Sequence, residues 1–280
     1  MLETLFLFFL AFAWIIFATV QDLRSREIAN WLNFSLPIFA LGARFFYSLF
    51  FAGNLYFFYQ GLMGLVLFFI LGNLFYYGKL FAGGDAKLFI GLGAILPFST
   101  SFLPNLESFL TFIMLFLFAG AAYGIVASIF LCMKNYGRFR KEFAKQAKRN
   151  RTTIWLSLAA SLAFIAFALY INSLFFILAI ASFAFPFLYS YAKAVDEAAM
   201  VKTVDPSALR VGDWLYGDVK TGNRKIKAEW GGLTMHDIHL LKKAKKKVKI
   251  SEGVAFTPVF FVSFAIFFYI WSRGLWYPFW

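Results

Sequence analysis

The sequence predicts an all-α membrane protein, a polytopic helical bundle of about eight transmembrane helices with a small cytoplasmic domain. Three observations support this prediction. First, 61% of the 280 residues are hydrophobic and only 15% are charged, whereas soluble domains carry about 25% charged residues. Second, the apolar residues gather in stretches long enough to cross a bilayer. Third, the basic residues gather between those stretches. The composition excludes an ordinary soluble enzyme, a disordered chain and a disulfide-rich secreted domain.

Eight apolar stretches of about 17–25 residues are expected to span the membrane. In chain order they cover residues 4–21, 31–51, 55–77, 85–103, 109–133, 153–171, 174–192 and 254–272. The first lacks the basic start of a cleavable signal, so we expect it to be retained as a span. Only Asn172 and Ser173 separate 153–171 from 174–192. This pair is a helical hairpin or, alternatively, one long tilted helix with a buried piece.

The basic residues predict the side of the membrane that each connecting segment faces, because cytoplasmic loops carry an excess of Lys and Arg. With eight spans and both termini outside, 25 of the 27 Lys and Arg residues fall on the cytoplasmic side. Only Arg44 and Arg273 fall toward the outside. The net charge of +13 therefore indicates topology and contact with membrane lipid, not nucleic acid.

Five regions follow from this pattern. Residues 1–133 form a membrane core with both candidate acids, 134–152 a basic cytoplasmic loop, 153–192 a transmembrane hairpin, 193–253 a cytoplasmic domain, and 254–280 the last transmembrane helix and the C-terminus. Within the polar region, Thr234 and Asp237 predict a helix start with Thr234 as N-cap. Residues 238–249 are then expected to form a basic helix near the membrane surface.

Two aspartates, Asp22 and Asp85, are the candidate catalytic groups. They are the only Asp residues among the first 195, and each lies at a predicted cytoplasmic end of a span. Ionisable groups at membrane depth are costly and are candidates for function; the alternative is that both are interfacial and solvated. Gly83 and Gly84 directly precede Asp85, and glycines let another backbone approach closely, as an extended peptide beside an acid must.

Two carboxylates that come together can perform acid–base chemistry on a peptide bond. They share one proton, because like charges a few Å apart cannot both ionise easily. One can then act as base on a water while the other acts as acid on the peptide. No Ser–His or Cys–His pair in the spans competes with them, and Cys132 is the single cysteine. Two Asp without a neighbouring His or Cys make a poor metal site, so we expect no metal and no cofactor.

These motifs resemble the type IV prepilin peptidases, and among them the archaeal preflagellin and prepilin peptidases, which are intramembrane GxGD-type aspartyl proteases. The residues that match the first family motif are Asp22, Arg24, Arg26, Ile28 and Asn30. Those that match the second are Gly84, Asp85, Lys87 and Leu88. The resemblance covers residues 1–100 and continues weakly at 252–258. Ala82 departs from the first glycine of the signature, and Ala29 from a proline that many members carry.

The resemblance implies an aspartic endopeptidase in the cell membrane that cuts at the cytoplasmic face. Its expected partners are precursor pilins or archaellins with a class III-type signal peptide, with Asp22 and Asp85 as catalytic residues. The expected substrate-binding residues are Gly83, Gly84, Arg24, Arg26 and Lys87. Arg24 and Arg26 equally suit anchoring of the helix end, and Lys87 equally suits snorkelling to the headgroups.

An alternative function is a proton-coupled membrane transporter that uses the membrane Asp residues as a relay. That function favours acids near mid-membrane and internal repeats. Here both acids lie near one face and no repeat is evident. The oligomeric state stays open.

Overall fold

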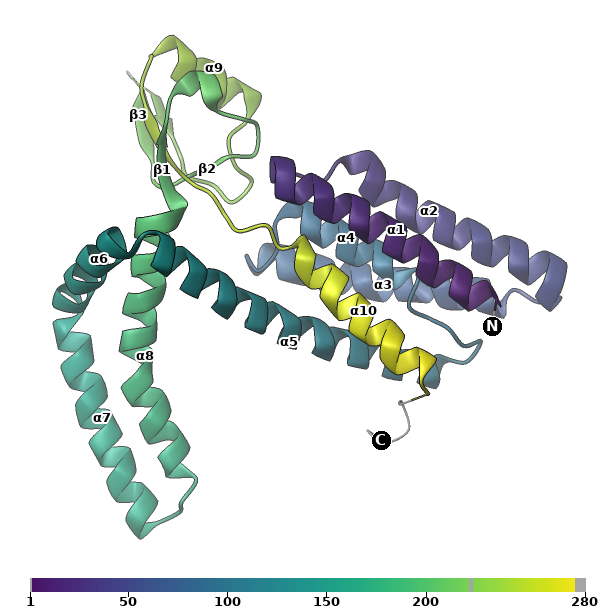
Figure 1. Ribbon diagram of the computed structural model, residues 1–280, viewed down its shortest axis with the longest axis horizontal. Coiled ribbons are helices and arrows are strands. Elements are labelled where there is room, and N and C mark those ends of the chain that lie inside the picture. Colours follow the sequence, from purple (N-terminus) through teal and green to yellow (C-terminus); the bar gives the residue numbers. More distant parts are fainter. Residues whose placement is uncertain (1, 222–223, 275–280) are drawn as a thin grey trace. The chain divides into compact units, whose positions relative to one another are not determined.

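The computed structural model describes residues 2–221 and 224–274 and confirms an all-α polytopic membrane protein (Figure 1). The described residues contain six helices long and apolar enough to cross a membrane: Leu2–Ser25, Asn30–Ala52, Tyr56–Tyr77, Phe102–Lys134, Arg151–Tyr170 and Phe175–Met200. The chain divides into two compact units. The first, which we call the core unit, contains 1–124 and 254–280, and the second contains 125–253.

The core unit is built from helices around an aromatic interior. Its elements are α1 (Leu2–Ser25), α2 (Asn30–Tyr47), the π-helical turn η1 (Ser48–Ala52), α3 (Tyr56–Tyr77), α4 (Gly83–Gly93), the first two thirds of α5 (Phe102–Lys134), and α10 (Thr257–Ser272). Phe8 of α1 contacts Phe264 and Phe268 of α10, so the last helix packs beside the first. Residues 275–280 of the predicted C-terminal region lie outside the described residues.

The predicted span at 85–103 is shorter than expected. Helix α4 has 11 residues, which at 1.5 Å per residue is about 16 Å, roughly half of a 30 Å hydrocarbon core. Residues 94–101 continue in turns and irregular backbone. Hydropathy predicted this stretch as a full span because its side chains are apolar, although only its first half is helical.

Arg44 satisfies the carbonyl groups exposed where α4 ends. Its guanidinium is fully buried and donates to the carbonyl oxygens of Ala94 (2.7 Å), Ile95 (3.0 Å) and Phe57 (3.1 Å), and also to that of Pro97. Irregular backbone at membrane depth must find partners within the protein. Arg44, which the topology count placed toward the outside, is therefore an internal cap for α4.

Helices α3 and α4 approach closely through glycines. A Cβ added at Gly64 would lie 2.2 Å from the carbonyl oxygen of Gly93, and one added at Gly93 would lie 2.5 Å from that of Gly64. Small residues at helix contacts are typical of membrane proteins, where close backbone approach provides the packing. This contact fixes α4, and with it Asp85, against α3.

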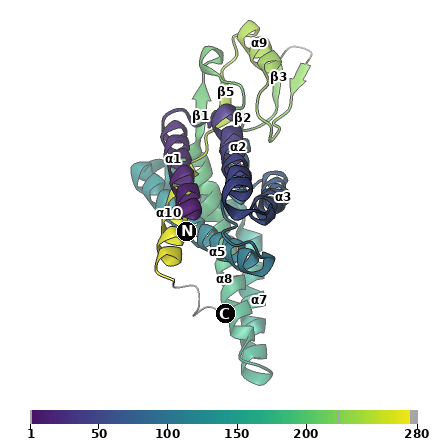
Figure 2. The ribbon, with the colours of Figure 1, turned by 90° about the vertical axis from the view of Figure 1, so that its right-hand side faces the viewer.

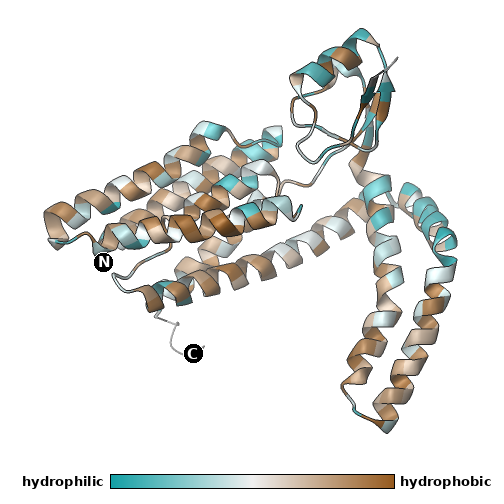
Figure 3. Ribbon diagram, turned by 180° about the vertical axis from the view of Figure 1, so that it is seen from behind, coloured by the Kyte–Doolittle hydropathy of each residue, from teal (hydrophilic) through white to brown (hydrophobic). Residues whose placement is uncertain are grey.

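The second unit begins in α5 and contains a basic helix and a hairpin. Residues 136–149 of the segment predicted as a basic connection form α6 (Tyr136–Arg149). Helices α7 (Arg151–Tyr170) and α8 (Phe175–Val195) pack as an antiparallel hairpin, which excludes the single long helix. Asn172 Oδ1 accepts from the amide of Leu174 in the turn. In Figure 3 the hairpin is hydrophobic over most of its length, whereas α6 is largely hydrophilic.

A small mixed domain follows α8 through a π-helical turn, η2 (Asp196–Met200). Its three-stranded antiparallel sheet has the order β1 (Val201–Val204), β5 (Val248–Ser251), β2 (Trp214–Leu215). The other elements are the 3-10 turn η3 (Pro206–Ala208), the hairpin of β3 (Val219–Thr221) and β4 (Arg224–Ile226), and α9 (Met235–Lys243). Figure 2 shows α9 beside these strands.

The predicted N-cap of the helix in this domain is confirmed, but its predicted length is wrong. Thr234 and Asp237 form a capping box at the start of α9. The helix ends at Lys243, and residues 248–251 form β5 instead of a further helical turn. Alternating burial of Val248 and Ile250 places these two side chains in the domain core with Ile238 and Leu241.

Candidate active site at two buried carboxylates

Asp22 lies in the last turn of α1 and is held by the start of α10. Its side chain is buried, with 7% exposed. One oxygen, Oδ2, accepts two hydrogen bonds from Thr257, from the backbone amide at 3.2 Å and from Oγ1 at 2.9 Å. Thr257 is the first residue of α10, so its amide is one of the donors that a helix leaves unpaired at its N-terminus. The positive end of the α10 dipole therefore faces a carboxylate.

The chain after Asp22 turns sharply toward α2. Arg26, with φ +60°, adopts the left-handed conformation that commonly ends a helix, and its amide donates to the carbonyl oxygen of Asp22. The Gln21 side chain accepts from the amide of Ala29 at 3.0 Å. Arg24 and Arg26 are exposed on this turn. The turn places the rest of the first motif over the start of α4.

Asp85 is the third residue of α4 and is also buried, with 8% exposed. An acid in the first helical turn is favoured by the helix dipole. Gly84 faces Ile28, because a Cβ added at Gly84 would lie 3.4 Å from three carbons of that side chain. Gly83 has more room, since its added Cβ would meet only a ring carbon of Tyr76, at 3.8 Å.

Side chains of the first motif contact the second motif directly. Lys87 Nζ donates to Asn30 Oδ1 at 2.7 Å and lies 5.6 Å from the centre of the Phe34 ring. Asn33 Nδ2 donates to the carbonyl oxygen of Gly84 at 3.4 Å. The structure thus brings the segment that follows Asp22 against Gly84 and Lys87, whereas Arg24 and Arg26 are exposed.

The two carboxylates interact electrostatically across this contact. Both side chains are buried, with 7% and 8% exposed. Among the described residues no group of three or more His, Cys, Asp or Glu side chains is arranged to hold a metal ion. The arrangement suits acid–base chemistry by a pair of carboxyl groups.

Three residues at the site were not predicted from the sequence. Thr257 binds Asp22, and Tyr123 of α5 donates to the carbonyl oxygen of Ala255 at 2.7 Å, which fixes the segment that leads into Thr257. Asn33 is buried, and its Oδ1 has no hydrogen-bond partner among the described residues. The Thr-Pro pair at 257–258 marks a helix start, but no local pattern connects it to an acid 235 residues earlier.

The part of the chain that contains both aspartates is similar to known peptidases. Residues 9–129 match the type IV leader peptidase family. A preflagellin peptidase of Methanococcus voltae is 30% identical over 129 residues, which are 43% of this chain and 54% of the relative. Preflagellin peptidases of Methanocaldococcus jannaschii and Methanococcus maripaludis are 36% and 38% identical over 84 residues, 30% of this chain and 35% of each relative.

The chain therefore spans between about a third and about half of the length of these relatives. No solved structure matches it. The matched region contains Asp22 and Asp85 with their surrounding motifs, and the resemblance predicted from those motifs is confirmed.

Proposed function

We propose that the protein, whose residues 9–129 match the type IV leader peptidase family, is an aspartic endopeptidase that removes the leader peptide from archaellin or type IV pilin-like precursors. The observation that carries the proposal is the pairing of two buried carboxyl groups, Asp22 and Asp85, from the ends of two helices. The relatives named as preflagellin peptidases support the substrate class.

In the proposed reaction one carboxylate removes a proton from water as the water oxygen attacks the scissile carbonyl carbon. The other carboxyl group donates its proton to the carbonyl oxygen. When the tetrahedral intermediate collapses, the C–N bond breaks, the leaving nitrogen takes up the proton that came from water, and one hydroxyl of the intermediate returns its proton to the other carboxylate. The products are a carboxylic acid and an amine, and the dyad again holds one proton. A positioned acid or base contributes about 10²–10⁴-fold to such a reaction.

The substrate is proposed to lie along the glycines at the start of α4. Gly83 has the more open surroundings of the two, and the buried Oδ1 of Asn33 beside Gly84 provides an acceptor for a peptide amide. Arg24 and Arg26, exposed at the end of α1, and Lys87 line the approach to the acids. Because most Lys and Arg residues lie in segments predicted to face the cytoplasm, cleavage is proposed to occur at that face.

The test is cleavage of a purified precursor archaellin by purified full-length protein in detergent. Asp22→Asn and Asp85→Asn should each lower the cleavage rate at least about a hundredfold. The double variant should be little worse than either single one, because residues that act as a unit are not additive. Glu107→Gln, which removes an exposed acid of the core unit, should leave the rate unchanged. Rates above about 1% of wild type in either Asp variant would exclude the dyad.

A further inference from the structure

A polar cavity of about 330 Å³ lies in the second unit, between α6, α8, η2 and the residue after β2. It takes no part in the proposed peptidase site, whose residues all belong to the core unit. The lining residues are Gln146, Arg149, Asn150, Tyr189, Lys193, Glu197 and Tyr216. Almost every lining side chain can donate a hydrogen bond, so the cavity suits a ligand that is rich in acceptors.

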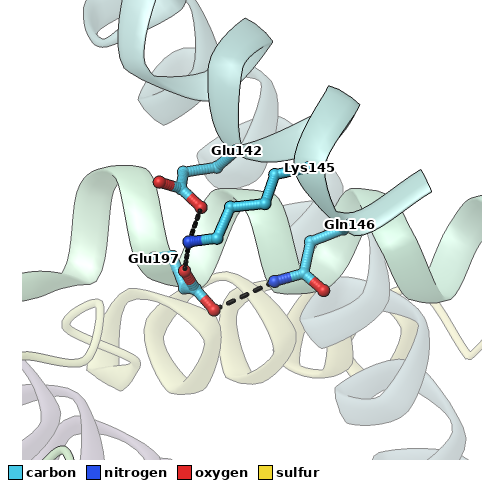
Figure 4. Close-up of polar contacts among 4 residues, drawn as sticks. All are labelled: Glu142, Lys145, Gln146 and Glu197. Atoms are coloured by element: carbon cyan, nitrogen blue, oxygen red, sulfur yellow. Dashed lines mark hydrogen bonds and ion pairs between the residues drawn. The ribbon is translucent and has the colours of Figure 1, made fainter. Parts of the chain in front are cut away.

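The only acid among the cavity's lining residues already has partners (Figure 4). Glu197 accepts from Gln146 Nε2 at 3.0 Å and pairs with Lys145 Nζ at 3.6 Å. Lys145 also binds Glu142 at 3.0 Å. The hydrogen bond to Glu142, followed by the charges of Glu142 and Glu197, raises the pKa of the Lys145 ammonium group. Lys145 is therefore a charged partner for both acids, and Glu197 leaves little acceptor capacity to compete with a ligand.

Two cations of the lining stay available for an anion. Arg149, at the last residue of α6, and Lys193, in the last turn of α8, are exposed. Neither has a carboxylate within ion-pair distance among the described residues. A guanidinium group presents a planar set of donors that matches phosphate, and the ammonium group adds a second positive charge. The phenol of Tyr189 supplies a further donor, whereas that of Tyr216 is hydrogen-bonded to Glu197.

The position of the cavity along the hairpin indicates which kind of anion could reach it. It lies where α6 ends and α7 begins, with Asn150 four residues before the first apolar residue of α7, Ile154, and where the apolar part of α8 gives way to Lys193. Both helices are long and apolar enough to span a bilayer. Trp155, 61% exposed in the first turns of α7, is a residue type that anchors at the headgroup level. The cavity therefore opens at the depth of lipid headgroups.

We propose that this cavity binds the phosphate-bearing headgroup of an anionic membrane lipid. The phosphate contacts Arg149 and Lys193, and the acyl chains run along the exposed apolar faces of α7 and α8. Basic pockets between membrane helices at the cytoplasmic side are known to hold such headgroups. Anionic lipid thereby fixes the hairpin and α6 to one another at the membrane surface.

Native mass spectrometry of the purified full chain in detergent tests this proposal, with phosphatidylglycerol and phosphatidylcholine of the same acyl chains as probes. Phosphatidylglycerol should bind about tenfold more tightly than phosphatidylcholine. Because each cation near a headgroup contributes about 1 kcal/mol, Arg149→Gln/Lys193→Gln should weaken phosphatidylglycerol binding about 30-fold. The control Arg138→Gln/Lys141→Gln removes two exposed cations of α6 that do not line the cavity, and should change binding less than twofold.

A third variant changes binding in the opposite direction. Glu197→Gln removes the acid of the lining, so it should tighten phosphatidylglycerol binding. If the Arg149→Gln/Lys193→Gln variant has a lower melting temperature than wild type, the Glu197→Gln variant becomes the deciding test. Unchanged or weaker phosphatidylglycerol binding by Glu197→Gln would then overturn the proposal. Equal losses in the cavity and control variants would also overturn it, because they would indicate a diffuse surface charge. Displacement of the lipid by millimolar inorganic phosphate would show that the site takes a free anion instead of a headgroup.

Discussion

Thr257 makes the surroundings of the two candidate acids unequal. It donates twice to one oxygen of Asp22 from the first turn of α10, whereas Asp85 lies in the first turn of its own helix beside two glycines. Carboxyl groups with different surroundings can take different roles in acid–base catalysis. Thr257 is therefore a positioning residue for Asp22.

Thr257→Val keeps the shape of the side chain and the backbone amide but removes the hydroxyl donor. A hydrogen bond to a charged group is worth about 1.5–3 kcal/mol, so we expect kcat to fall about 10- to 100-fold with little change in KM. Thr257→Ser, which retains the donor, should cleave the precursor nearly as fast as wild type. Steady-state kinetics on both variants measure this, and equal rates for Val and Ser would assign Thr257 to packing alone.

The two glycines before Asp85 give different predictions. Gly84→Val would press its branched carbons onto Ile28, which already lies 3.4 Å from the position of a Cβ, so it should lower both the melting temperature and the cleavage rate. Gly83→Val has room in the folded protein and should melt like wild type, but should cleave poorly because its side chain occupies the proposed path of the substrate. Normal cleavage by a stable Gly83→Val protein would place the substrate elsewhere.

At the scale of elements, α4 shows that hydropathy predicts an apolar stretch but not how much of that stretch is helical. The apolar stretch 85–103 predicted a complete span, but the helix ends at Gly93 because Arg44 offers partners for the carbonyl groups beyond it. That contact joins residues 50 or more positions apart, so no local pattern could predict it. By contrast, Thr234 and Asp237 predicted the start of α9 correctly, because capping depends on residues three apart.

The glycine contact between α3 and α4 predicts an element-scale effect. Gly64→Ala would place a Cβ 2.2 Å from the Gly93 carbonyl oxygen, and forcing atoms into a packed contact costs about 1–3 kcal/mol. Gly42→Ala on α2 is the matched control, because nothing lies within 4 Å of its added Cβ, and Ala favours a helix by up to about 1 kcal/mol. Thermal unfolding in detergent should show destabilisation in the first variant only.

At the scale of the whole molecule, the proposed site could be predicted only in part. Asp22, Asp85 and Lys87 could be proposed from the sequence because their motifs are local and because acids are rare within apolar spans. Thr257, Tyr123 and Asn33 were missed because their roles depend on how distant helices pack. The fold class followed from composition and span length, which are global properties of the chain.

The distribution of basic residues predicts the orientation of the chain. Lys220→Cys, in a Cys132→Ser background, should resist an impermeant thiol reagent in intact cells and react after lysis, because the polar domain is predicted to be cytoplasmic. Asn54→Cys, exposed in the connection before α3 and predicted to lie outside, should react in intact cells. The opposite labelling pattern would reverse the orientation and the proposed face of cleavage.

The internal cap made by Arg44 has a consequence for biosynthesis. Three of its four carbonyl partners lie 50 to 53 residues downstream. At about 5–20 residues per second, a ribosome needs roughly 2.5–10 s to make them. During that interval the guanidinium group in the last turn of α2 lacks these three acceptors. Helix α2 therefore reaches its final packing only after α4 and the residues that follow it have been synthesised. The core unit is thus not assembled span by span, because α2 depends on a segment made later.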